Sequence, residues 1–236
     1  MTATPSQWRP WIGRAAAELA IVVLGVSVAL WADNWAAERN DREKEAARLV
    51  ALRDNVDETL VDVEVHLEES RLVAEQLRAI ITQPSDGPEA MRARLRWALF
   101  YGPVFSPELN VYDDLKSSGE LSLLTNPALR SALARMDASM GRVQLAQSDL
   151  SNVQQLHIDS FAIDSTPVRL FYAEEIGLTE VDTGNEDPFD FVDDPRFRGR
   201  MVLKLDLVTQ LEIRFREAGE ALVKVRELID EQLETG

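Results

Sequence analysis

Residues 17–35 read AELAIVVLGVSVALWADNW, and this stretch decides the fold class. The chain is apolar over residues 15–32, apart from one glutamate and one serine. A run of about 18 apolar residues is near the minimum that crosses a hydrocarbon core of about 30 Å, and it is long for an ordinary buried helix. We therefore predict a transmembrane helix over residues 15–35. Cleavage of an export signal after Ala29 and a buried core helix remain as alternatives.

Tryptophans flank the apolar run on both sides. Four of the five tryptophans of the chain lie here: Trp8, Trp11, Trp31 and Trp35. At 1.5 Å per residue, Trp11 and Trp31 are about 30 Å apart along a helix, which is the separation of the two aromatic belts of a membrane. We therefore predict that these side chains anchor the helix at the two interfaces of a lipid bilayer.

One face of the same helix carries mostly small residues. At 100° per residue, five positions fall within about 40° of one another: Glu18, Gly25, Ala29, Ala32 and Ala36. Small residues four apart allow a second helix to approach closely. This face is a predicted association surface, for a second copy of the chain or for a membrane-protein partner. The alternative for Glu18 is an interfacial carboxylate without a partner.

Composition limits the function of the remaining residues, which suffice for one domain with a substantial core. The formal net charge is −16, and such an acidic surface repels nucleic-acid phosphates, so we expect no nucleic-acid partner. The chain has no cysteine, which removes disulfides and thiol chemistry. The basic residues on the two sides of the apolar run leave the orientation of the chain in a membrane undecided.

Downstream of the apolar run, apolar residues recur mainly at three- and four-residue steps, the period of amphipathic helices. Turn and cap residues divide this pattern into predicted helices that cover residues 36–81, 88–101, 107–118 and 127–163, and the chain from 195 onward. Ser106 and Asn126 are predicted N-caps, and Gly119 is a predicted helix end. Residues 164–193 show no sustained period and are predicted to form an acidic, irregular, solvated connector rather than a calcium site.

Two of these helices carry the clearest apolar seams. The seam of the helix after Asn126 includes Leu129, Leu133, Met136, Met140, Val143 and Leu150. In the last helix the seam alternates steps of three and four without a break: Val208, Leu211, Phe215, Ala218, Leu222, Val225 and Ile229. The predicted fold is therefore all-α: a tail (1–14), a transmembrane helix (15–35) and an antiparallel helical bundle (36–236).

The search for chemistry in the sequence yields few candidates. His66 and His157 are the only histidines, and neither has the spacing of a helical metal site. We expect His66 to be a boundary histidine with a local hydrogen bond. His157 is predicted to join a polar layer with Gln147 and Gln154, or to line a small-ligand pocket. No catalytic residue, metal ligand or cofactor is predicted.

A distinctive stretch, YDDLKSSGELSLL, covers residues 112–124. It has the features of a helix C-terminus, with Lys116 favourable to the helix dipole and Gly119 as the cap. The alternative is a recognition surface formed by Tyr112, Asp113, Lys116, Ser117 and Ser118.

Two stretches carry a resemblance to a known family: AELAIVVLGVSVALWADNWAAER and YDDLKSSGELSLLTNPALRSALARMD (112–137). The first contains an N-W-x-x-E-R motif formed by Asn34, Trp35, Glu38 and Arg39. In these stretches the chain resembles a family of bacterial single-pass membrane proteins of unknown function. The resemblance implies a bacterial inner-membrane protein whose C-terminal domain is periplasmic, and it brings no known activity.

These observations favour a non-enzymatic role. The expected function is a membrane-anchored helical scaffold or interaction protein that self-associates through its N-terminal helix. The alternative is an extracytoplasmic ligand-binding sensor domain that signals through a partner.

Overall fold

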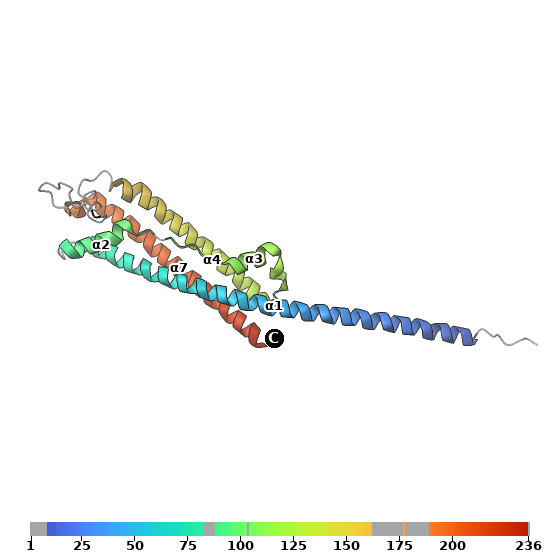
Figure 1. Ribbon diagram of the computed structural model, residues 1–236. Helices are drawn as coiled ribbons and strands as arrows, with labels where there is room; N and C mark the ends of the chain where they lie inside the picture. The colour runs from blue at the N-terminus through green and yellow to red at the C-terminus, as the bar shows by residue number, and fades with distance from the viewer. Residues whose placement is uncertain (1–8, 83–87, 103, 162–176, 178–188, 236) are drawn as a thin grey trace, which may run out of the picture. The chain divides into compact units, whose positions relative to one another are not determined.

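The computed structural model describes residues 9–82, 88–102, 104–161, 177 and 189–235 (Figure 1). The described residues form helices and turns and contain no strand, so the predicted all-α class is confirmed. The long helices are α1 (Arg9–Thr82), α4 (Pro127–Val153) and α7 (Pro195–Thr235). The shorter elements are α2 (Pro88–Phe100), α3 (Asn110–Ser118), two 3₁₀ turns (Glu120–Leu123 and Asp190–Asp193) and one π-helical turn (Gln154–Asp159).

The chain divides into two compact units, residues 1–49 and 50–236, and α1 contributes residues to both. In the first unit, eight large apolar side chains are 54–68% exposed: Leu19, Val23, Leu24, Val26, Val28, Leu30, Trp31 and Trp35. Polar contacts begin where this apolar segment ends. The Arg39 guanidinium lies 5.9 Å from the ring centroid of Trp35 and forms an ion pair of 3.0 Å with Glu43.

The prediction of a transmembrane helix over residues 15–35 is contradicted. Within the part of the chain that the structure describes, none of the helices combines the length and the apolar character that a bilayer crossing requires. The predicted location in a bacterial inner membrane, with a periplasmic C-terminal domain, is therefore wrong.

In the second unit, α1 buries one stripe of side chains against the rest of the bundle. Leu52, Val56, Val63, Val73 and Leu77 are at most 1% exposed. Two buried hydroxyls interrupt the apolar stripe, and each donates a hydrogen bond to a carbonyl one turn earlier. The Thr59 hydroxyl reaches the Asn55 carbonyl at 2.8 Å, and the Ser70 hydroxyl reaches the His66 carbonyl at 2.8 Å. These bonds satisfy both groups inside the helix, so neither needs a partner elsewhere.

Helices α4 and α7 begin and pack as the sequence predicts. The side chain of Asn126 accepts hydrogen bonds from the backbone N–H groups of Ala128 and Leu129, which caps α4. Both predicted seams are buried: the six seam residues of α4 are at most 3% exposed, and the seven seam residues of α7 are 0% exposed. These two helices pack against each other, and α7 runs antiparallel to both α1 and α4 (Figure 1).

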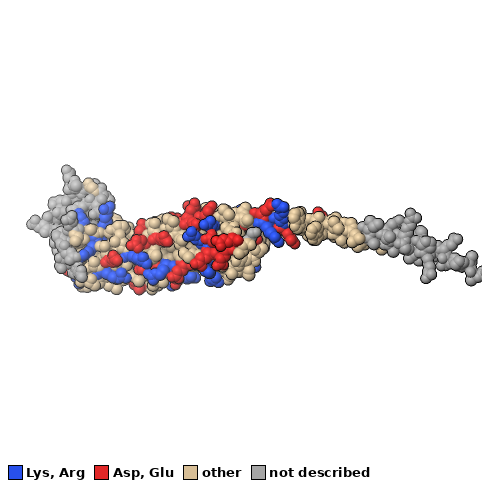
Figure 2. Space-filling model, turned by 90° about the horizontal axis from the view of Figure 1, so that it is seen from below, with Lys and Arg blue, Asp and Glu red and all other residues tan. Residues whose placement is uncertain are grey.

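Charged pairs join α1 to α7 along the surface of the second unit. Arg53 pairs with Asp230 at 2.9 Å, Asp57 with Arg226 at 3.1 Å, and Arg71 with Glu212 at 3.6 Å. The numbers rise along α1 while they fall along α7, as antiparallel helices require. Figure 2 shows both signs of charge interspersed along this face. All of these pairs are partly exposed, so each is worth at most about 1 kcal/mol and mainly sets the register.

The start of α3 differs from the prediction. The helix begins at Asn110, three residues later than the predicted first residue, Pro107. Its first turn is capped by a side chain from another helix rather than by Ser106. Asn55 of α1 donates to the Glu108 carbonyl at 2.6 Å and accepts from the Val111 N–H at 3.2 Å. The end of α3 is as predicted, because Gly119 has φ 79° and closes the helix in the left-handed conformation.

Candidate functional site

A lysine lies in the core of the bundle, where apolar side chains are expected. The α7 seam extends backward from Val208 through Lys204 and Met201 to Phe197, and all four side chains are 0% exposed. The Lys204 Nζ donates three hydrogen bonds. It reaches the Ala98 carbonyl at 2.6 Å, the Tyr101 carbonyl at 3.1 Å and the Gln154 Oε1 at 2.6 Å. Three acceptors match the three N–H groups of an ammonium.

The C-terminus of α2 explains why a cation is held here. The last carbonyls of a helix have no partner within the helix, and they carry a partial negative charge. Lys204 satisfies the carbonyl of Ala98 in this last turn, and Gln154 satisfies the next one. The Gln154 Nε2 donates to the Leu99 carbonyl at 2.8 Å and to Asp159 Oδ1 at 2.7 Å, which fixes the orientation of its amide.

Burial lowers the pKa of Lys204 to about 7, because the charged amine loses its hydration. The negative charge of Asp159 opposes this shift. Lys204 therefore titrates near neutral pH while it holds the end of α2 in place.

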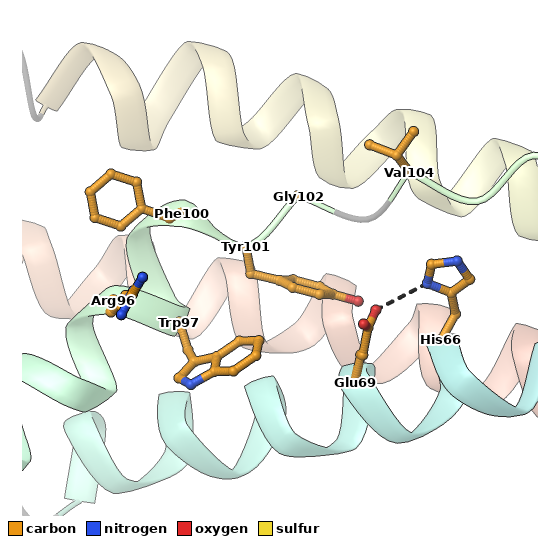
Figure 3. Close-up of a pocket in the computed structure, with 8 residues that line it drawn as sticks. All are labelled: His66, Glu69, Arg96, Trp97, Phe100, Tyr101, Gly102 and Val104. Atoms are coloured by element: carbon orange, nitrogen blue, oxygen red, sulfur yellow. Dashed lines mark hydrogen bonds and ion pairs between the residues drawn. The ribbon is translucent and has the colours of Figure 1, made fainter. Parts of the chain in front are cut away.

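The end of α2 forms one wall of a pocket of about 530 Å³ (Figure 3). Helix α1 contributes His66 and Glu69 to it. Helix α2 and the segment that follows it contribute the other lining residues: Arg96, Trp97, Phe100, Tyr101, Gly102 and Val104. Lys204 binds the carbonyls of Ala98 and Tyr101, which belong to the same segment as the lining residues Trp97, Phe100 and Tyr101. Lys204 therefore fixes the position of this aromatic wall from within the core.

His66 is held rigidly at one end of this pocket. Its Nδ1 lies 3.0 Å from Glu69 Oε2, and it donates this hydrogen bond because a carboxylate only accepts. The imidazole stacks on Phe215, with ring centroids 5.8 Å apart and planes 17° apart. Phe105 meets the imidazole edge-on, at 5.4 Å. The predicted boundary histidine with a local hydrogen bond is confirmed.

Tyr101 forms part of the pocket wall with its hydroxyl turned toward α1. The hydroxyl lies 3.3 Å from the Ser70 hydroxyl. Burial raises the pKa of Tyr101, and the negative charge of Glu69 raises it further. The phenol is therefore neutral at physiological pH, and its ring presents an uncharged aromatic face.

The arrangement offers binding groups rather than a reactive pair. Ser70 donates its proton to the His66 backbone carbonyl, so this serine is not activated by the imidazole. No group of three His, Cys, Asp or Glu side chains that would hold a metal ion occurs among the described residues. The pocket combines aromatic surface with a carboxylate and an imidazole, which are the features of a small-molecule binding site.

The predicted recognition surface at the end of α3 converges on α4. Asp137 of α4 accepts a hydrogen bond from Lys116 at 2.7 Å and one from the buried Tyr112 hydroxyl at 3.3 Å. Asp113 is exposed. The Ser117 and Ser118 hydroxyls bond to carbonyls of their own helix. The structure therefore gives Tyr112 and Lys116 a joint role in docking α3 onto α4.

The remaining predicted residues do not line the pocket. His157 is exposed in the π-helical turn, and the polar layer of the bundle is formed by Lys204 and Gln154 without it. In the first unit, Trp31, Trp35 and the small residues of the association face are exposed: Gly25, Ala29, Ala32 and Ala36. Trp8 and the side chains of Trp11 and Glu18 fall outside the described part of the chain, as does most of the connector 164–193.

The sequence does not predict the pocket or its buried lysine. One signal was available for Lys204, because it lies four residues before Val208 and three after Met201, in step with the apolar seam. Trp97 and Tyr101 carried no comparable signal, since aromatic residues near a helix end usually belong to the core. Comparison of the chain with protein-family models, with curated proteins and with solved structures gives no match in any of the three.

Proposed function

We propose that the protein is a non-enzymatic helical interaction protein whose bundle binds a small ligand in the pocket beside His66. The observation that carries this proposal is the aromatic wall of the pocket. Trp97 is 39% exposed although it lies beside a carboxylate and an imidazole in a concave site. A large indole left in contact with water at such a place is a common feature of ligand-binding sites.

The fixed arrangement of the side chains in the pocket supports binding of a specific ligand. The hydrogen bond to Glu69 and the stacking on Phe215 keep the His66 ring in one orientation. Lys204 holds the segment that carries the aromatic residues. A pre-organised wall loses little conformational entropy when a ligand binds, which favours affinity.

Truncation of Trp97 tests the proposed function. We expect that at least one class in a panel of small amines, carboxylic acids and neutral aromatic compounds raises the melting temperature of the wild type. The same compounds should leave the Trp97→Ala variant unchanged, because a ligand stabilises only a folded state that binds it. Val223→Ala removes an exposed apolar side chain of α7 outside the pocket and is the matched control. A panel without any Trp97-dependent shift contradicts the proposed function.

A second proposed function is self-association through the first unit. The eight exposed apolar side chains between Leu19 and Trp35 support it, because an apolar surface of this extent on one helix marks an interaction site. We propose a second copy of the chain as the partner. The small residues at Gly25 and Ala29 leave room for a helix to approach, and no atom lies within 4 Å of a Cβ built on Gly25.

The absence of native cysteines allows a direct test of this association. An Ala29→Cys variant is expected to form a disulfide-linked dimer under mild oxidation, because Ala29 lies on the predicted contact face. Ser27→Cys changes a single atom about 160° away around the helix and is the matched control. The fraction of dimer is measured on non-reducing gels. Equal cross-linking of both variants, or of neither, contradicts the proposed association face.

A further inference from the structure

The pocket beside His66 has a negatively charged end. The Glu69 side chain is 42% exposed, so its carboxylate remains accessible to a ligand. One carboxylate oxygen, Oε2, accepts the hydrogen bond from His66. The negative charge of the carboxylate also acts on the neighbouring phenol of Tyr101, whose pKa it raises. Figure 3 shows the Glu69 carboxylate pointing toward the Tyr101 hydroxyl, inside the ring of lining residues. This end attracts a cation and repels an anion.

The middle of the pocket is aromatic. In Figure 3 the rings of Trp97 and Tyr101 lie between Glu69 at one end and Arg96 with Phe100 at the other. The face of an aromatic ring is electron-rich and attracts an ammonium group, and the indole of Trp is the strongest of the three aromatic side chains in this respect. A carboxylate next to such rings is a typical receptor for an organic ammonium ion.

The opposite end of the pocket is lined by Arg96 and Phe100, away from Glu69 (Figure 3). Phe100 continues the apolar surface of the two rings toward this end. The net charge of −16 adds a field that concentrates organic cations near the protein.

We infer that the pocket binds an organic ammonium compound, with its positive charge between Glu69 and the rings of Trp97 and Tyr101. This inference rests on the proposed ligand-binding function and names the chemical class of the ligand. The apolar part of the bound ligand lies along the aromatic wall toward Phe100.

Two probes of the same shape and different charge test the inference. Phenethylamine is a cation at pH 7, and 2-phenylethanol is its neutral counterpart. Isothermal titration of the full chain is expected to give about tenfold tighter binding of phenethylamine, which is the usual scale of a cation held by aromatic rings and a carboxylate. Trp97→Leu is expected to weaken the binding of both probes.

A pair of glutamate variants identifies the carboxylate. Glu69→Gln keeps a hydrogen-bond acceptor for His66 but removes the charge, so it should reduce the preference for phenethylamine over 2-phenylethanol and leave only the part that the aromatic rings supply. Glu68→Gln removes the same charge one residue away, from a side chain that is 76% exposed and paired with Arg71. This control should keep the preference.

The outcomes separate the inference from the function on which it rests. Equal affinity of the two probes in the wild type overturns the inference of an ammonium ligand and leaves the ligand-binding pocket intact. A preference that Glu69→Gln leaves undiminished also overturns the inference. If the wild type binds neither probe while another compound class gives a Trp97-dependent shift, the inference fails alone. If no compound gives such a shift, the proposed function fails with it.

Discussion

The Lys204→Ala variant is expected to lose about 3–5 kcal/mol of unfolding free energy. The substitution removes a fully buried side chain and leaves three acceptors without a donor: the carbonyls of Ala98 and Tyr101 and the Gln154 amide oxygen. The cavity and the unsatisfied polar groups both destabilise the folded state. Urea unfolding followed by circular dichroism measures the loss.

An exposed lysine of the same helix serves as the control. Lys224 pairs with Glu227 at 2.9 Å on the surface, and its side chain is half exposed. Lys224→Ala should change the unfolding free energy by less than about 0.5 kcal/mol. Similar losses for the two variants would show that Lys204 is not the buried donor that the structure describes.

The pH dependence gives this prediction a second measurement. The pKa of Lys204 is about 7 in the folded state and has its ordinary value near 10.4 when unfolded. Between these pH values the unfolded chain binds more protons than the folded chain, so this group makes the protein more stable as pH rises. The difference in unfolding free energy between wild type and Lys204→Ala should therefore increase from pH 7 to pH 10, by up to about 1.4 kcal/mol per pH unit. A flat or falling difference contradicts the lowered pKa.

Local signals predicted the elements of the bundle well. The alternating seam of α7 requires one buried face whatever lies opposite, so Leu211, Phe215 and Leu222 could be assigned to the core from spacing alone. Asn126 before a proline, and Gly119 after a polar helix end, each act within one turn. Their roles therefore do not depend on the rest of the fold.

Features that depend on contacts between residues far apart in the chain could not be predicted from the sequence. The cap of α3 comes from Asn55, more than 50 residues upstream, so the local signal at Ser106 predicts the wrong cap. The pocket joins His66 of α1 to Trp97 of α2, and nothing in either segment indicates that the two meet. A lysine is usually exposed, and only the acceptors around Lys204 make its burial tolerable, so the sequence alone does not place it in the core.

Replacement of Phe215 by alanine is expected to cost about 3–5 kcal/mol of unfolding free energy. Phe215 is 0% exposed on the α7 seam. Its ring meets Phe105 edge-on at 5.2 Å and stacks on His66 at 5.8 Å, so the substitution removes apolar burial and two aromatic contacts together. Phe215→Leu retains most of the volume and should cost less than half as much, because the cavity that it leaves is smaller. Chemical denaturation measures both variants, with Val223→Ala on the exposed face of α7 as the control.

The loss of unfolding free energy in Phe215→Ala also tests the structure of the pocket. Phe215 supports the imidazole of His66 at the negatively charged end of this pocket. A loss below about 1 kcal/mol would mean that Phe105, Phe215 and His66 do not form one packed aromatic cluster, and the rigid placement of His66 would no longer follow.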